Sequence, residues 1–261
     1  MYLPVAPRFR DELLNVWETF TAALPAARLE RGDGYVVVSY PPFPSAAMNA
    51  VWSWGGGGSA AAELASRLAE IEAAGVSPGV IVSDGEAPEL EREARRLGLT
   101  ERYEIPGMVA TAETFQPADA AGLDIVVALE PEQYEQALDV AAAGFGFPRE
   151  WAEELYSPAM LNIGVRLYLG LTASRPVTTA LAFRSEGSVG IFNVATPAEE
   201  RGRGYGAAVT SRAAADGFAA GARMVWLQAS GMGFGIYERL GFETVSTAEL
   251  WVRPDADVTG V

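Results

Sequence analysis

The residues best suited to chemistry form one short loop, Arg201-Gly202-Arg203-Gly204-Tyr205-Gly206-Ala207, which precedes an Ala-rich segment. Its three alternating glycines carry no Cβ and accept positive φ, so successive backbone N–H groups can converge on one anion. A helix that begins here adds unpaired N–H donors and the positive end of its dipole. Arg201 and Arg203 add charge at the same place. The pattern predicts a phosphate-binding loop, with a flexible strand-to-helix turn as the alternative.

Three residue types that often carry chemistry are missing from the chain. Its 261 residues include no Cys and no His, and all 19 positive side chains are Arg, so Lys is absent too. This composition excludes disulfides, cysteine nucleophiles, Cys/His zinc sites, Ser-His-Asp triads and Schiff-base lysines. We expect no metal. Carboxylates, Tyr, Ser and Thr hydroxyls, Arg and backbone amides remain available for catalysis.

The charge balance narrows the choice of partners. With 34 acidic side chains against 19 basic ones, the net charge is −15, which disfavours nucleic acid and suits a cationic substrate such as an amine. Acidity that only keeps the protein in solution is the simpler interpretation. The first residues lack the apolar core of a signal peptide, and no run of about 18 apolar residues occurs. We therefore expect a cytoplasmic protein without a membrane partner.

The second half of the chain predicts an α/β domain. A β-branched strand at 124–129 precedes an amphipathic helix from Pro131 and a shorter helix at 148–156. Three strands, at 165–172, 177–184 and 189–194, lead through the loop into an Ala-rich helix that ends near Gly221. A strand (224–228), a short helix (234–240) and a last strand (243–252) follow. The predicted order is βααβββαβαβ, with helices on both faces of a sheet.

The first half repeats this order in a thinner form. Helices are predicted at 11–24, 60–74 and 89–97, and strands at 35–40, 80–83 and 102–110. ARRLGLTE (Ala94–Glu101) aligns with YERLGFET (Tyr237–Thr244) at an offset of 143, which is 237 minus 94. The repeat favours duplication, with domains at 1–116 and 124–261 and a linker at 117–123. In this alignment Ala94 takes the place of Tyr237.

A dinucleotide-binding site is the alternative for the glycine loop, because Gly202-x-Gly204-x-x-Ala207 fits that fingerprint nominally. That fingerprint requires an acidic residue about 20 positions further on to bind ribose. No Asp or Glu lies between Asp216 and Glu238, and the chain that remains is too short for a doubly wound fold. A nucleotide-dependent dehydrogenase is therefore disfavoured.

Two segments carry a resemblance to a known family. VATPAEERGRGYGAA (Val194–Ala208) fits a pyrophosphate motif of Gln/Arg-x-x-Gly-x-Gly/Ala, and LQASGMGFGIYERLGF (Leu227–Phe242) fits a strand followed by a helix that ends Tyr-x-x-x-Gly-Phe. In these residues the second half resembles the GNAT superfamily of acyl-coenzyme-A-dependent N-acyltransferases, over roughly 124–252. The first half resembles a degenerate second copy, and its WSWGGGGSAA (Trp52–Ala61) lacks the paired arginines. The implied fold is two GNAT-like α/β domains, each a mixed, mostly antiparallel sheet with helices on both faces.

The resemblance implies a role for each matching residue. Backbone groups of Val194, Ala195 and Thr196 would face the thioester and the pantetheine arm of acetyl-coenzyme A. The loop from Arg201 through Ala207, with Gly202, Arg203, Gly204, Tyr205 and Gly206, would hold the pyrophosphate. Ser230 stands where the family often has Asn and would bond the pantetheine. Tyr237 would protonate the departing thiolate, and Asn193 would orient a water or the substrate.

The reaction implied is transfer of an acetyl group from acetyl-coenzyme A to the primary amine of a small, cationic acceptor. The general base stays open among Glu153, Glu154 and Glu186. Two alternatives also remain: a non-catalytic protein that binds acyl-coenzyme A or an amine, and transfer to a protein N-terminus or lysine. Both a monomer and a homodimer fit the sequence.

Overall fold

The computed structural model describes residues 5–54, 59–83 and 87–259. The chain divides into two compact units. The C-terminal unit contains Met1–Val16 and Met108–Val245, and the N-terminal unit contains Trp17–Gly107 and Ser246–Val261. The units therefore do not coincide with the contiguous domains 1–116 and 124–261 expected from the sequence, because each unit includes a chain end from the opposite half.

The C-terminal unit is built on a mixed sheet with the strand order β5-β10-β9-β8-β7-β6. Strands β6 to β9 pair antiparallel with their neighbours, whereas β10 pairs with β9 in parallel. Its elements are β6 (Asp124–Val127), α4 (Pro131–Phe145), α5 (Arg149–Leu155), α6 (Pro158–Leu161), β7 (Val165–Thr172), β8 (Arg175–Ser185), β9 (Ser188–Ala195), α7 (Tyr205–Ala219), β10 (Met224–Gln228) and α8 (Phe234–Arg239).

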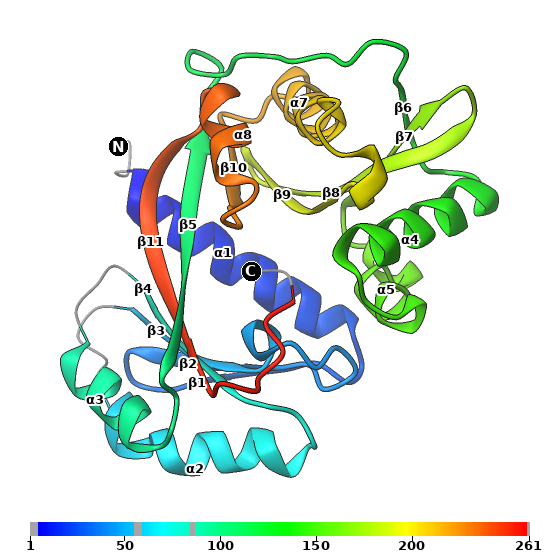
Figure 1. The fold of residues 1–261 in the computed structure, drawn as a ribbon. Coiled ribbons are helices and arrows are strands. Elements are labelled where there is room, and N and C mark those ends of the chain that lie inside the picture. Colours follow the sequence, from blue (N-terminus) through cyan, green and yellow to red (C-terminus); the bar gives the residue numbers. More distant parts are fainter. Residues whose placement is uncertain (1–4, 55–58, 84–86, 260–261) are drawn as a thin grey trace. The chain divides into compact units, whose positions relative to one another are not determined.

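Helices cover both faces of this sheet, with α7 on one side and α4 and α5 on the other (Figure 1). Side chains that alternate along the strands explain the arrangement. Tyr168 and Ala180 share one core cluster with Val209 of α7. Leu167 and Leu169, on either side of Tyr168 in β7, are buried on the opposite face. Both faces of the central strands are therefore apolar, as an α/β layer structure requires.

The first residues of helix α1 (Val5–Ala23) belong to the C-terminal unit. Phe9 packs edge-on against Trp226 of β10, with ring centroids 5.4 Å apart. Arg8 donates a hydrogen bond of 3.2 Å to the carbonyl of Gly187, and Glu12 accepts one from Ser185. The helix begins before the predicted residue 11 because these contacts stabilise its first turns.

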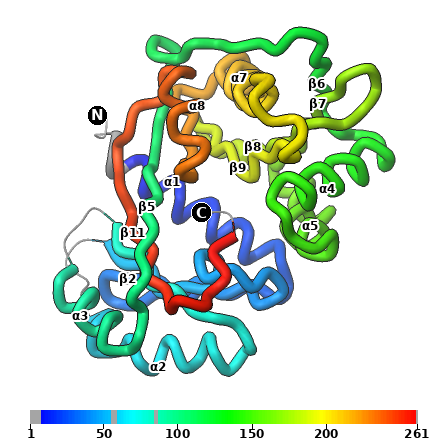
Figure 2. The backbone as a smooth tube through the Cα atoms, in the orientation of Figure 1, coloured from blue at the N-terminus to red at the C-terminus, as the bar shows by residue number. Residues whose placement is uncertain are grey.

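The N-terminal unit has the strand order β1-β2-β3-β4-β11-β5 and places α2 and α3 on one face of its sheet (Figure 2). Its own core contains Leu64 and Leu68 of α2, Leu90 of α3, and strand residues such as Val51 and Val80. Its elements are β1 (Arg28–Arg31), β2 (Tyr35–Ser39), β3 (Ala50–Trp54), α2 (Ala60–Ala73), β4 (Gly79–Ser83), α3 (Pro88–Arg96) and β5 (Glu101–Ala110).

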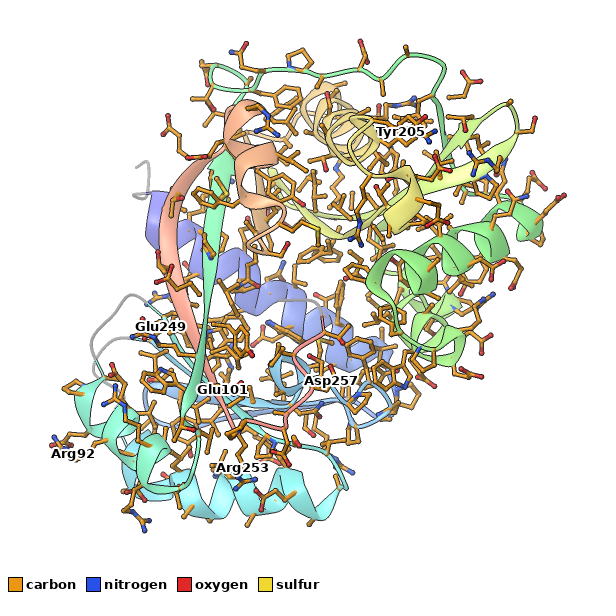
Figure 3. All side chains as sticks on the ribbon, in the orientation of Figure 1. Arg92, Glu101, Tyr205, Glu249, Arg253 and Asp257 are labelled. Carbon is orange, nitrogen blue, oxygen red and sulfur yellow. The ribbon has the colours of Figure 1, made fainter. Side chains whose placement is uncertain are left out.

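Strand β11 (Glu243–Val252) enters both units, because its second half pairs antiparallel with β4 from Ala248 opposite Ser83 to Trp251 opposite Val80. Trp251 lies in the core of the N-terminal unit, with the guanidinium of Arg95 4.5 Å from its ring centroid. Ion pairs link Glu249 to Arg102 and Arg253 to Glu72 along the same stretch, where Figure 3 labels Glu249 and Arg253. These contacts explain why a boundary drawn from the linker misses the end of the chain.

The structure confirms the predicted fold class, since each unit is an α/β domain with a mixed sheet. It confirms the order βααβββαβαβ as well, with the short helix α6 in addition. The prediction is wrong in omitting β1 and β3. The glycine run at 55–58 lies outside the described residues. Within the described ranges, none of the helices is both long enough and apolar enough to cross a membrane.

Candidate functional site

The end of strand β9 contains a β-bulge at Asn193. Thr179 lies opposite Ala195 and Leu181 lies opposite Phe192, so β9 has one residue more than β8 over this stretch. Asn193 occupies the extra position with a φ of 52°, a left-handed conformation that Asn tolerates better than most residues. Its carbonyl accepts a 3.2 Å hydrogen bond from the hydroxyl of Tyr156, whose pKa is raised by burial.

Strands β9 and β10 separate after the third residue of β9. They pair in parallel from Ser188 opposite Met224 to Gly190 opposite Trp226. After these three residue pairs β9 continues for five residues, to Ala195, and β10 for two, to Gln228. The backbone groups of these last residues are not used in a ladder between the two strands. A ligand that lies along β9 can therefore bond to them as a further strand would.

The loop after β9 presents six consecutive amides without acceptors. Among the described residues, none accepts a hydrogen bond from the N–H groups of Gly202 through Ala207, and the first helical bond runs from Ala208 to Gly204. Gly202 and Gly204 have φ of 78° and 82°, which L side chains rarely adopt. Gly204 caps α7, so the helix dipole adds its positive end to these amides. Unpaired amides at a helix start are suited to an anion.

Helix α7 starts against the end of β9. A Cβ added at Gly206 would lie 3.7 Å from Thr196 Oγ1 and 3.9 Å from Val194 Cγ1. Ala195 is buried, and Val194 and Thr196 are half-buried. Tyr205, labelled in Figure 3, is buried at the first position of α7. The structure thus brings Val194, Ala195 and Thr196 together with the Arg/Gly loop, as the sequence predicts.

Arg201 ties the loop to two neighbouring segments. Its Nε donates a 3.0 Å hydrogen bond to the carbonyl of Thr196, and its Nη2 donates one of 2.7 Å to the carbonyl of Gly144 near the end of α4. Helix α4 lies close, because a Cβ on Gly144 would be 2.9 Å from Ala195 Cβ and 3.0 Å from the amide nitrogen of Thr196. Arg201 therefore fixes the loop geometry through these bonds, a role that the sequence did not indicate.

Arg203 does not lie free beside the loop. Its Nη1 is 3.1 Å from Oε2 of Glu200, a buried carboxylate whose Oε1 accepts a hydrogen bond from Arg175. The hydrogen bond and charge of Glu200 raise the pKa of Arg175, with smaller contributions from Tyr205 and Glu199. Sequence reasoning missed both Arg175 and Glu200. A signal was present, since the antiparallel hairpin of β8 and β9 places Arg175, at the start of β8, near the residues that follow β9.

Ser230 and Tyr237 lie after β10. The Ser230 hydroxyl accepts a 3.2 Å hydrogen bond from the amide of Gly233, a local turn bond that leaves its own proton available to a ligand. Tyr237 belongs to the core cluster against which Val194 packs, with its ring centroid 6.1 Å from that of Phe242. Its hydroxyl has no hydrogen-bond partner among the described residues. Burial raises the pKa of Tyr237 to about 12.

Two of the three suggested general bases, Glu153 and Glu186, have exposed side chains. Glu153 is 61% exposed and pairs with Arg149 at 3.1 Å. Glu186 is exposed in the turn between β8 and β9, at the opposite end of β9 from Asn193. Over the described ranges, no group of three or more Asp and Glu side chains is placed to hold a metal ion.

The N-terminal unit lacks the corresponding opening. Its parallel strands β3 and β4 pair along their whole length, from Ala50 opposite Gly79 to Trp54 opposite Ser83. Trp52 Nε1 also donates a 2.8 Å hydrogen bond to Ser83 Oγ across this pair. Ala94, the counterpart of Tyr237 in the internal repeat, is fully buried and has no hydroxyl. Within the described part of the chain, the C-terminal unit thus has parallel strands that separate and a tyrosine at the repeated position, whereas β3 and β4 stay paired and Ala94 takes that position.

Comparison with solved structures defines the fold. A GCN5-related N-acetyltransferase from Kribbella flavida is 20% identical, with a TM-score of 0.67 and 98% of each chain covered. One from Sphaerobacter thermophilus is 17% identical, with a TM-score of 0.62 over 96% of this chain and 88% of the other. A tandem GNAT protein from the clavulanic acid biosynthesis pathway is 13% identical, with a TM-score of 0.59 over 89% and 86%. No protein-family model and no curated protein sequence matches significantly. The chain has the GNAT fold, as the motifs predict.

Proposed function

We propose that the chain is an N-acetyltransferase that moves the acetyl group of acetyl-coenzyme A to the primary amine of a small, cationic acceptor. The observation that carries the proposal is the run of six unpaired amides from Gly202 to Ala207 at the start of α7. This run lies near the end of β9, whose last residues do not pair with β10, so their backbone groups could bond an extended arm. A pyrophosphate attached to a pantetheine chain matches both features.

The direct route needs only groups that this chain holds. The acceptor nitrogen attacks the thioester carbon, the C–S bond breaks, and the amine proton passes to solvent or a carboxylate. A backbone N–H near Val194 would stabilise the oxyanion, and Asn193 would orient the acceptor or a water. With both reactants held side by side, proximity supplies much of the rate.

Tyr237 would act on the leaving thiolate, but its burial changes the nature of that help. A thiol has a pKa near 8.5, well below the value of about 12 for Tyr237, so complete proton transfer to the thiolate is uphill. A hydrogen bond from the hydroxyl to the sulfur stabilises developing charge without requiring transfer. We assign Tyr237 this role.

The second candidate is a protein that binds acyl-coenzyme A or an amine without turnover, because the unpaired amides from Gly202 to Ala207 would serve binding alone equally well. Incubation with acetyl-coenzyme A and a library of primary amines, followed by mass spectrometry of the products, separates the two. The transferase yields an amine that is heavier by one acetyl group and free coenzyme A. Binding of acetyl-coenzyme A with no acetylated product from any amine would favour the second candidate.

A further inference from the structure

Two arginine side chains at the edge of the amide cradle carry an inference that rests on the proposed function and sharpens it. We propose that Arg175 and Arg203, held together by Glu200, bind the 3′-phosphate of coenzyme A. This chain would then distinguish coenzyme A from its 3′-dephosphorylated form.

The two guanidinium groups lie close to each other on Glu200. Arg203 belongs to the loop itself, and Arg175 comes from the start of β8, yet both reach the same carboxylate. Tyr205, at the first turn of α7, contributes to the electrostatic environment of Arg175. Both arginines are therefore near the edge of the amide cradle, although they come from different elements.

Glu200 is far more deeply buried than the two arginines that pair with it. The carboxylate side chain is 5% exposed, whereas the side chains of Arg175 and Arg203 are 58% and 54% exposed. Its Oε2 receives no hydrogen bond of good geometry within the described residues, although Arg203 Nη1 lies 3.1 Å away. A buried carboxylate is costly unless cations compensate it. Glu200 therefore holds two guanidinium groups on the surface, where their remaining N–H donors face solvent.

The charge and the N–H donors of this cluster suit a phosphate group. Arg175, Arg203 and Glu200 together carry one net positive charge, which the nearby Glu199 carboxylate offsets in part, and the two planar guanidinium groups keep several unused N–H donors. Phosphate monoesters carry close to two negative charges at neutral pH and suit guanidinium donors better than any neutral group does. The six amides of the loop already suffice for the pyrophosphate. Coenzyme A carries one further phosphate, the 3′-monoester on its ribose, which is thus the natural ligand for a second cationic group at the edge of the cradle.

Calorimetric titration of the full-length protein with coenzyme A and with 3′-dephospho-coenzyme A tests the inference. We expect the unaltered protein to bind coenzyme A at least about 10-fold more tightly, and R175Q to bind both ligands about equally, close to the unaltered protein's affinity for the dephosphorylated form. R175K should retain part of the preference, because it keeps the charge without the planar donors. R184Q, which removes the same charge from the far end of β8, is the matched control and should keep the full preference.

Equal affinity of the unaltered protein for the two ligands would overturn the inference and leave the proposed function intact. Retention of the preference in R175Q, with its fold verified by circular dichroism, would overturn the role of Arg175. Loss of the preference in R184Q to the same extent would show that overall charge, and not this pair, is responsible. Failure of the unaltered protein to bind either ligand would overturn the proposed function itself.

Discussion

Arg201 donates a 2.7 Å hydrogen bond from Nη2 to the carbonyl oxygen of Gly144, and so connects the Arg/Gly loop to the last turn of helix α4. The final carbonyls of a helix have no partner within it, and an arginine is a strong donor for them. A second bond from the same guanidinium reaches Thr196. The residue that the motif assigns to the ligand thus also fixes the position of the loop.

Replacement of Arg201 by Gln should weaken both functions of this side chain. We expect the free energy of unfolding to fall by about 1 kcal/mol, because charge-assisted hydrogen bonds are lost at an exposed position. Affinity for acetyl-coenzyme A should fall about 10-fold, because the amides no longer keep their arrangement. Urea denaturation and calorimetry measure the two effects.

Arg184 provides a matched control for this variant. Its Nη2 donates a 2.8 Å hydrogen bond to the carbonyl of Ala220, which follows the end of α7, in the same manner as Arg201 at α4. R184Q should lower stability by a similar amount and leave the affinity for acetyl-coenzyme A unchanged. An equal loss of affinity in both variants would contradict a specific role for Arg201.

Replacement of Tyr237 by Phe should lower kcat about 10- to 100-fold with little change in KM, because the hydroxyl acts on the leaving sulfur. Because burial raises the pKa of Tyr237 to about 12, this group stays protonated from pH 6 to pH 10. The pH profile of kcat should therefore have the same shape in both proteins and follow the amine. A basic limb near pH 9 that disappears in Y237F would argue against this account.

The buried Tyr237 also affects how the free energy of unfolding changes at alkaline pH. The pKa of Tyr237 is about 12 in the folded state, against an ordinary value of 10.0. Below pH 10 both states keep the proton and stability is unaffected. Between pH 10 and 12 the unfolded chain loses its proton first, so the free energy of unfolding falls, by about 2 to 3 kcal/mol at pH 12 for this group. Denaturation of Y237F should show a shallower decline, and an identical decline would refute the assignment.

Gly144 should not tolerate a side chain. Alanine normally stabilises a helix relative to glycine, but here its Cβ would lie 2.9 Å from Ala195 Cβ and 3.0 Å from the Thr196 nitrogen. We expect G144A to lose about 1 to 3 kcal/mol of stability and to shift the end of β9. G235A is the control, since its Cβ would meet only the flexible Arg239 at 3.6 Å, and it should gain about 0.5 kcal/mol. Thermal denaturation distinguishes the two, and a stable G144A would disprove the close packing of α4.

Local patterns predicted most elements of the fold. Strand-like runs separated by short turns indicated β7, β8 and β9, and the glycines at 202 and 204 indicated the start of α7. Strand β3, Ala50–Trp54, was not predicted because it has one β-branched residue, whereas β2 and β4, which are as deeply buried, have three each. The bulge at Asn193 was not predicted either, because the register of β9 against β8 decides which residue is unpaired, and the sequence of β9 alone does not give this register.

Longer-range features could not be inferred from spacing alone. The last half of β11 joins the N-terminal unit because Trp251 packs into that core, and no turn or linker marks the change. Glu200 carries no signal in the sequence, because it resembles any exposed acid in a polar loop. Only the hairpin of β8 and β9 brings Arg175 to it.

Isothermal titration calorimetry with acetyl-coenzyme A tests the central claim most directly, because the six amides from Gly202 to Ala207 define a site in the C-terminal unit and β3 and β4 provide no second one. We expect saturable binding with one molecule per chain, weakened about 10-fold in R201Q and unchanged in R184Q. Absence of detectable binding at millimolar ligand, or binding that R201Q leaves untouched, would contradict it.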